Sequence, residues 1–193
     1  KTPSARWVGL ISVADVNATS TAVTAAGGKV VYAPVMLGER GETAVFKDPE
    51  GVLFGVVHSK SGDPLDYAGD LNEWYWVDLW TADVEKAATF YRAAIGYETA
   101  PVADDGPRSG VRLLSGGFAR AGIMQKNSEK SSATWLPYIR VADAKAAAAA
   151  ARAAGGKVLL DPVAMNIATV AIIADPTGAP VGIVQLPTPE AQP

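Results

Sequence analysis

Short stretches of alternating apolar and polar residues are the first regular pattern along this chain. One of them, RWVGLISVAD, ends at Asp15 and precedes about ten residues with helical spacing of apolar positions. Asp15 is placed to cap this helix, and Gly27-Gly28 ends it, because glycine accepts the left-handed conformation at a helix C-terminus. Three short strands follow, two of them joined by the turn-forming residues Asp-Pro-Glu-Gly at 48–51. The pattern predicts the element order βαβββ.

The same pattern returns later in the chain with identical residues. The hexapeptide AAGGKV occurs at Ala25–Val30 and again at Ala153–Val158, 128 residues later. RWVGLISVAD aligns with TWLPYIRVAD at that offset, and KDPEGVLFGVV aligns with ADPTGAPVGIV after a slip of one residue. A more divergent copy begins with EWYWVDLWTADVEKAATFYRAAIGYE at Glu73–Glu98. Matching residues that recur in the same order along the chain indicate an internal repeat.

The repeat predicts three βαβββ modules and an α+β fold in which such modules pair. Module one covers 5–58, module two 73–126 and module three 133–187. Between the first two lies SKSGDPLDYAGDLN, whose Gly, Pro, Ser and Asp content is typical of a linker.

Composition narrows the classes of function. The 193 residues are 49% hydrophobic and carry a net charge of −3, with basic and acidic residues interspersed. No basic stripe suits a phosphate backbone, so we expect no nucleic-acid partner. No apolar run reaches about 18 residues, so we expect no membrane span. The absence of cysteine excludes disulfides, thiolate catalysis and cysteine zinc sites. A cytoplasmic location is the default expectation, and export of a longer precursor stays open.

The residues that close the predicted helices carry a family resemblance. FYRAAIGYE closes the helix of module two, whereas AAGGKV followed by DPxGxxxxxV marks modules one and three. This combination resembles the vicinal oxygen chelate superfamily, which includes glyoxalase I, bleomycin-resistance proteins and extradiol dioxygenases. Within it, the chain is most similar to tandem-domain proteins related to a 27 kDa antigen. The resemblance implies that a first-half and a second-half module pair around one cleft.

The resemblance also implies a domain organisation. Residues 73–188 would form a complete two-module domain, with 61–72 as the linker before it. Residues 1–60 would be a second-half βαβββ module of an incomplete N-terminal domain, because their Gly-Gly pattern is of the second-half type. A single module of this size would expose one sheet face. We therefore expect residues 1–60 to pair with a missing first-half module or, in a homo-oligomer, with another chain.

Metal-dependent members of the superfamily carry His, Glu or Gln ligands on the first and last strands of each module. Counting from the helix-capping aspartates places these positions on side chains that cannot coordinate a metal. The positions hold Trp76, Gly122, Leu136, Gly182, Val8 and Gly55. We therefore expect no metal and no cofactor, and a metal bound through other residues stays open.

Strand alternation selects the side chains that would line the cleft. The candidate ligand-binding residues are Trp74, Trp76, Trp80, Arg120, Met124, Leu136 and Arg140. Asp78 and Tyr138 are candidate catalytic residues, because a carboxylate in apolar surroundings can act as a general acid or base. Each assignment has a structural alternative. The tryptophans can instead pack in the core, and Asp78 can instead be a structural anchor that is hydrogen-bonded to the backbone or to an arginine.

The sequence thus predicts a metal-independent, small-molecule-binding protein of the glyoxalase/bleomycin-resistance type. Its ligand, aromatic or of mixed polarity, would bind between modules two and three. Two alternatives stay open. One is an enzyme of the same superfamily, a lyase, isomerase or hydroxylase-like catalyst that uses Asp78 and Tyr138. The other is a structural or interaction protein whose modules mainly form interfaces.

Overall fold

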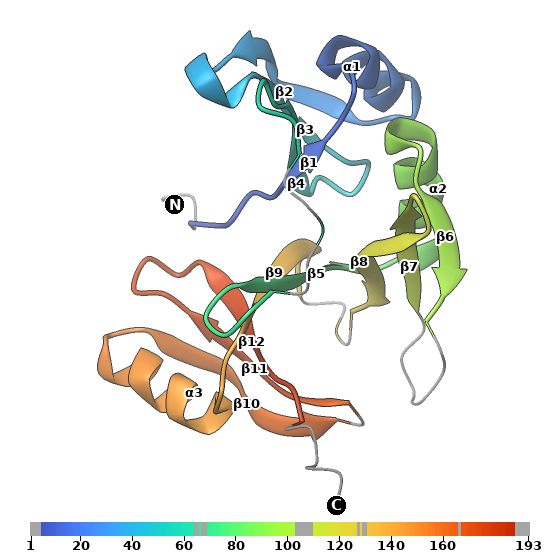
Figure 1. The fold of residues 1–193 in the computed structure, drawn as a ribbon. Helices are drawn as coiled ribbons and strands as arrows, with labels where there is room; N and C mark the ends of the chain where they lie inside the picture. The colour runs from blue at the N-terminus through green and yellow to red at the C-terminus, as the bar shows by residue number, and fades with distance from the viewer. Residues whose placement is uncertain are drawn as a thin grey trace, which may run out of the picture. The chain divides into compact units, whose positions relative to one another are not determined.

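The structure is a computed structural model that describes residues 5–63, 66, 69–102, 110–126, 128, 131–165 and 167–187 (Figure 1). The chain divides into two compact units. One unit contains residues 8–66 and 77–135, and the other contains residues 1–7, 67–76 and 136–193. Modules one and two therefore share a unit, except for the first residues of module two.

Module one is a four-stranded sheet with one helix. Its elements are β1 (Leu10–Ser12), α1 (Val16–Ala25), β2 (Lys29–Met36), the 3-10 turn η1 (Gly38–Arg40), β3 (Glu42–Lys47) and β4 (Leu53–His58). The strand order is β1-β4-β3-β2, with β1 parallel to β4 and the other pairs antiparallel. This leaves β2 at one edge of the sheet, where most of its residues are exposed.

Module two repeats this plan in the same unit. Its elements are β5 (Trp74–Thr81), α2 (Val84–Ile95), β6 (Glu98–Pro101), β7 (Gly110–Ser115) and β8 (Phe118–Gln125). Their order is β5-β8-β7-β6, and β5 runs parallel to β8. The helices α1 and α2 pack against each other, so the helical sides of the two modules meet (Figure 1).

The second unit is built on module three. Its elements are β9 (Thr134–Arg140), α3 (Ala144–Ala153), β10 (Lys157–Met165), β11 (Ala168–Ala174) and β12 (Pro180–Gln185). The first two residues of β9, Thr134 and Trp135, belong to the first unit. The strand order is β10-β11-β12-β9, with β9 parallel to β12. Within this unit, the backbone of Arg140 also exchanges hydrogen bonds with Asn72 and Glu73, which lie just before and at the start of the module-two segment.

The helix ends follow the chemistry that the sequence predicts. Asp15, Asp83 and Asp143 each have an extended backbone and accept a hydrogen bond from an amide of the first helical turn. The residues that follow the helices, Gly27 and Gly155, have φ of 92° and 85°, which only glycine adopts without strain. The predicted roles of these residues as caps and stops are confirmed.

The core of the first unit lies where the helical faces of both sheets meet. An aromatic series runs through it: Phe46 packs on Phe54, Phe54 on Tyr91, and Tyr91 on Trp135, with ring centroids 5.4–5.5 Å apart. Such contacts add stability beyond the apolar area that they bury. Module one is therefore joined to module two by a shared hydrophobic core.

The predicted α+β fold of βαβββ modules is confirmed by the element order. The predicted domain boundaries, with 73–188 as a complete domain and 61–72 as a linker, stay predictions. Among the residues that the structure describes, no helix combines the length and apolar character that a membrane span requires.

Candidate functional site

The sheet of module two has one face packed on α2 and one turned away from it. Leu79, Leu113 and Ile123 point to the helical side and are fully buried there. Because side chains alternate along a strand, their neighbours lie on the other face. We call this second face of β5, β8 and β7 the module-two face.

One row across the module-two face places a carboxylate and a guanidinium on either side of a glycine. Strand pairing aligns Asp78 on β5 with Gly122 on β8, and Gly122 with Arg112 on β7. The Cα atoms of Asp78 and Arg112 are two strand spacings apart, roughly 9–10 Å. Gly122, which has no side chain, thus lies between one acidic and one basic residue of this row.

The adjacent row of the module-two face is apolar. It aligns Trp80 with Met124, and Met124 with Gly110. The thioether of Met124 lies over Gly110, where a Cβ atom would overlap the sulfur. A tryptophan and a polarisable methionine side by side suit a flat ligand group.

A glycine of the last strand lies opposite a first-strand side chain in every module. Leu10 lies over Gly55 in module one, and the ring of Tyr138 lies over Gly182 in module three; a Cβ atom at either glycine would overlap that side chain. The corresponding residue of module two is Asp78, opposite Gly122. The repeat thus places a carboxylate where the other modules have an apolar or aromatic side chain.

Arg120 is held by a carboxylate of the preceding segment. Its guanidinium donates two hydrogen bonds to Asp66, one of them 3.0 Å long, and lies 5.4 Å from the ring centroid of Phe118. This partnership holds the pKa of the exposed Asp66 below its usual range. The pairing of β7 with β8 is irregular between Leu113 and Leu114, so Arg120 lies at a bulge and outside the regular rows.

Five sequence-predicted site residues belong to the second unit. Leu136 and Tyr138 are buried on β9, and the Arg140 side chain donates to the carbonyl of Gly69 at 3.1 Å. Trp74 is half exposed and packs edge-to-face on Trp7, with centroids 5.2 Å apart. Trp76 is half-buried. The predicted residues that share the module-two face are Asp78, Trp80 and Met124.

The family of this chain follows from its similarity to known proteins. A family model described as a glyoxalase-like domain matches residues 74–184. The chain belongs to the glyoxalase-like family. The resemblance inferred from the Phe-Tyr and Gly-Gly patterns is confirmed.

Relatives of this glyoxalase-like chain come from actinobacterial sequences and from solved structures. "Putative glyoxylase CFP32" of Mycobacterium bovis is 29% identical over 175 residues, which are 90% of this chain and 67% of the relative. The "Anthracycline biosynthesis protein DauV" of Streptomyces sp. (strain C5) is 28% identical over 191 residues, covering 93% of this chain and 66% of the relative. The chain thus spans about two-thirds of the length of these relatives.

The Mn(II)-bound glyoxalase from Novosphingobium aromaticivorans superposes with a TM-score of 0.59 at 18% identity, covering 91% of this chain and 62% of that one. At this identity the likeness shows the fold alone.

The donor set at the expected ligand positions of this glyoxalase-like chain does not fit a metal ion. Gly122 and Gly182 offer no side chain, and Leu136 is buried and apolar. Within the described ranges, no group of three His, Cys, Asp or Glu side chains is close enough to hold a metal. Strand pairing also aligns Gly122 with Asp78, two residues beyond the expected Trp76.

A buried hydrogen-bond chain was missed by sequence reasoning. The Tyr91 hydroxyl donates to Asp48 Oδ2 at 3.2 Å and accepts from Trp135 Nε1 at 3.0 Å. Asp48 also accepts from the backbone amides of Glu50 and Val52. Burial raises the pKa of Asp48, and burial together with the charge of Asp48 raises the pKa of Tyr91 well above its usual value. These groups join the modules and do not lie on the module-two face.

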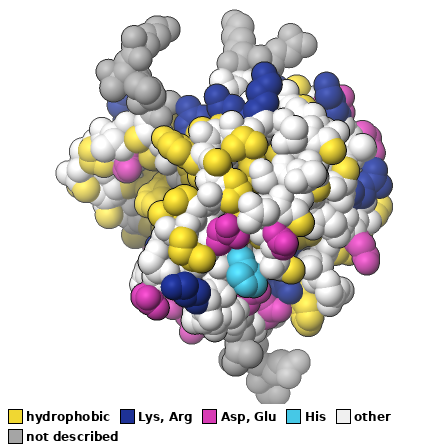
Figure 2. All heavy atoms as spheres, turned by 90° about the horizontal axis from the view of Figure 1, so that it is seen from above, with side chains coloured by type: hydrophobic (Ala, Val, Ile, Leu, Met, Phe, Trp, Pro, Cys, Tyr) yellow, Lys and Arg dark blue, Asp and Glu magenta, His cyan; other side chains and the backbone are white. Residues whose placement is uncertain are grey.

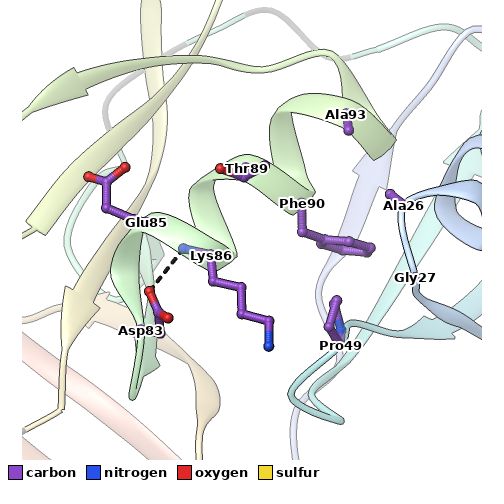
Figure 3. A pocket seen from close by; sticks show the side chains of 9 residues that line it. All are labelled: Ala26, Gly27, Pro49, Asp83, Glu85, Lys86, Thr89, Phe90 and Ala93. Atoms are coloured by element: carbon purple, nitrogen blue, oxygen red, sulfur yellow. Dashed lines mark hydrogen bonds between the residues drawn. The ribbon is translucent and has the colours of Figure 1, made fainter.

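A groove of about 680 Å³ lies on the helical side of the unit, at the C-terminal end of α1 and along α2 (Figure 3). Phe90 and Pro49 lie in it, and Lys86 and Glu85 are exposed on α2 at its border. Asp83 at its edge is occupied as the helix cap, accepting the amide of Lys86. The groove is on the opposite side of the sheet from the row of Asp78 and Arg112.

Arg112 was also missed, although the sequence carries a signal for it. In GVRLLS, Val111 and Leu113 are the apolar pair of an alternating strand, so Arg112 falls on the opposite face. Only the strand pairing shows that this face is the one that holds Asp78.

Proposed function

We propose that this glyoxalase-like chain binds a small organic molecule on the module-two face without the help of a metal ion. The observation that carries the proposal is the pair of adjacent rows, one with Asp78 and Arg112 around Gly122, the other with Trp80 and Met124. Ligand sites commonly combine a mostly apolar surface with a few convergent polar groups. The predicted cleft between modules two and three stays a prediction.

The two rows favour a ligand with an aromatic group and neighbouring oxygens. A guanidinium recognises a carboxylate or carbonyl oxygen through its planar fork of donors. Asp78 accepts a hydrogen bond from a ligand hydroxyl, and Trp80 with Met124 supports a ring. An aromatic 2-hydroxy acid has all three features, and the corresponding 2-keto acid lacks only the hydroxyl; we take mandelate and phenylpyruvate as probes of these two classes.

Metal independence is supported by the residues at the positions where the superfamily carries ligands. Two of them are glycines and one is a buried leucine. A guanidinium can neutralise ligand oxygens that a metal would otherwise hold.

The test is isothermal titration of phenylpyruvate and mandelate into chelator-treated protein. We expect binding without metal, weakened at least tenfold in Arg112→Met. Arg92→Met is the matched control, because Arg92 is exposed on α2 and its side chain bonds to Thr89 of the same helix; its affinity should equal that of the wild type. Binding that appears only after Mn²⁺ is added would overturn the metal-independent proposal.

The enzyme alternative is favoured by the same row of residues. A carboxylate beside a guanidinium can take a proton from carbon while the guanidinium stabilises the oxygen that gains charge. In phenylpyruvate, the C3 proton would pass to Asp78, and the C–H electron pair would form the enolate beside Arg112. Proton NMR in D₂O should show faster loss of the C3 signal with wild type than with Asp78→Asn. Equal rates would exclude this activity.

A further inference from the structure

A hollow of about 450 Å³ lies on the sheet of module one, on the face turned away from α1. Its lining residues come from β1, β4, η1 and the segment after β4: Leu10, Ser12, Glu39, Arg40, Val57, Ser59, Ser61, Gly62 and Asp63. Most of these side chains are polar, in contrast to the apolar face of β2 nearby. The lone histidine, His58, precedes this segment; it is exposed, and its Nδ1 lies 3.1 Å from the carbonyl oxygen of Val13.

A buried hydroxyl without a partner lies next to Val57, one of the residues that line this hollow. Strand pairing aligns Ser12 with Val57, and Val57 with Thr43, so the three side chains share one face. Thr43 is only 5% exposed, and among the described residues its Oγ1 is buried without a hydrogen-bond partner. Most buried side-chain hydroxyls in folded proteins are hydrogen-bonded, so such a group points to a partner that the chain itself does not supply.

The internal repeat shows that the module itself does not require this hydroxyl. In module three, Val170 pairs with Val184 as Thr43 pairs with Val57 in module one. The residue of module three that corresponds to Ser12 is Arg140, whose side chain is bonded to Gly69. At these two positions, the hydroxyl groups are thus particular to module one.

The charges of the hollow favour a neutral ligand. Two carboxylates, Glu39 and Asp63, lie with the Arg40 guanidinium, and the Lys60 ammonium is 4.0 Å from Glu39, so the charges nearly balance and favour neither an anion nor a cation. Ser12 donates to Asp63, and the hydroxyls of Ser59 and Ser61 are 3.1 Å apart. Carboxylate acceptors, a guanidinium donor and several hydroxyls together match a ligand that both donates and accepts many hydrogen bonds.

We propose that this hollow binds a polyhydroxylated small molecule, a sugar or a related polyol. Ligand hydroxyls donate to Asp63 and Glu39 and accept from Arg40, and one of them pairs with the Thr43 hydroxyl. The C–H face of the ligand lies on Leu10 and Val57. The site is on a different sheet from the module-two face, so it does not depend on the function proposed there.

The experiment is saturation-transfer NMR with methyl β-D-glucoside and myo-inositol, followed by titration. We expect a millimolar or tighter dissociation constant for at least one probe, weakened at least fivefold in Arg40→Met and in Thr43→Val. Thr43→Val removes an unpaired buried hydroxyl, so it should also raise the melting temperature of the free protein by about 2–4 °C. Thr169→Val on β11 is the matched control, with unchanged binding.

Arg112→Met separates this site from the module-two face and should leave polyol binding unchanged. The proposal is overturned if neither probe receives saturation at millimolar concentration. It is also overturned if Arg40→Met and Thr43→Val bind as the wild type does, or if Arg112→Met abolishes binding.

Discussion

At the scale of single residues, Tyr91 combines aromatic packing with a buried hydrogen-bond chain. It is fully buried, it packs on Phe54 and Trp135, and its hydroxyl links Asp48 to the indole of Trp135. A buried group that both donates and accepts is costly to remove, because each former partner is left unpaired. The hydroxyl therefore contributes to stability through two elements that are distant in sequence.

Tyr91→Phe should lower the free energy of unfolding by about 1–3 kcal/mol, because it leaves the Asp48 carboxyl and the Trp135 indole each short of a partner. Urea denaturation followed by tryptophan fluorescence measures the change. Tyr32→Phe serves as the control, since Tyr32 is 68% exposed; its effect should stay within about 0.5 kcal/mol. An equal loss in both variants would contradict the role assigned to Tyr91.

Asp48 should make the stability of the protein depend on pH in a defined direction. Burial raises its pKa above the usual value near 3.8. The folded state then binds this proton more tightly than the unfolded state, so the contribution is full below pH 3.8 and is lost as pH rises through the folded pKa.

The comparison for this prediction is Asp48→Asn, measured by urea denaturation at a series of pH values from acid to neutral. Relative to the asparagine variant, the wild type should lose stability as pH rises above 3.8. If the difference in stability between the two proteins is constant with pH, Asp48 has the same pKa in the folded and unfolded states, which contradicts the prediction.

At the scale of elements, the last-strand glycines determine how closely the first and last strands of a module pack. On β12, Gly182 lies beneath the ring of Tyr138 of the parallel neighbour β9. A side chain at Gly182 would force the ring out of its position. The same contact in module one is made by Leu10 over Gly55.

Gly182→Ala should therefore destabilise the second unit by about 1–3 kcal/mol through overpacking. In the double variant Gly182→Ala/Tyr138→Ala, the two effects should not add, with a coupling of about 0.5–3 kcal/mol. Gly9→Ala is the control, because a Cβ atom there would meet no neighbour within 4 Å. Additive effects in the double variant would show that the methyl group added at position 182 does not clash with the Tyr138 ring.

The aspartate caps provide a second prediction for elements. Asp143 accepts the amides of Lys145 and Ala146 at the start of α3. Asp143→Ala should cost about 0.5–2 kcal/mol, and Asp143→Asn should retain most of the stability, because asparagine also caps. Thermal melting followed by circular dichroism compares the two variants. A similar loss in both would mean that charge, not the cap bond, is what matters.

Local chemistry could be predicted from the sequence, and packing between distant segments could not. The caps, the glycine stops and the order of helices and strands along the chain follow from residues close together in the sequence. Asp48 and Tyr91 are 43 positions apart, and no local pattern links them. The face shared by Asp78 and Arg112 depends on strand pairing, and the position of Arg120 depends on a bulge between Leu113 and Leu114. These features are set by tertiary packing, which overrides local preference.

At the scale of the whole molecule, the surface combines exposed apolar strands with a small net charge. Tyr32, Val35 and Met36 on β2 and Leu159 and Val163 on β10 are all exposed, and hydrophobic side chains gather in patches on the surface (Figure 2). The net charge is only −3 at pH 7. Exposed apolar side chains favour association between protein molecules, and a small net charge repels them only weakly.

Solubility should therefore be lowest near the isoelectric point of about 5.2, where repulsion between molecules vanishes. Light scattering across pH 4–8 measures the association. Replacing Tyr32 and Leu159 with glutamate should reduce scattering at pH 7, whereas Thr24→Glu on the exposed surface of α1 adds negative charge without removing an apolar side chain and should reduce it less. Equal reductions would assign the effect to charge alone.

The turn at 48–51 has a consequence for where the chain can be divided. Glu50 in this turn accepts the hydroxyl of Thr81 and, at 3.2 Å, the amide of Ala82, at the junction of β5 and α2. A fragment that starts at Glu73 would lose these acceptors along with Asp48, and it would expose Phe90 and Tyr91 to solvent. A cut at residue 73 would thus remove contacts within one compact unit, and we expect a stable fragment of module two to keep the hairpin of module one.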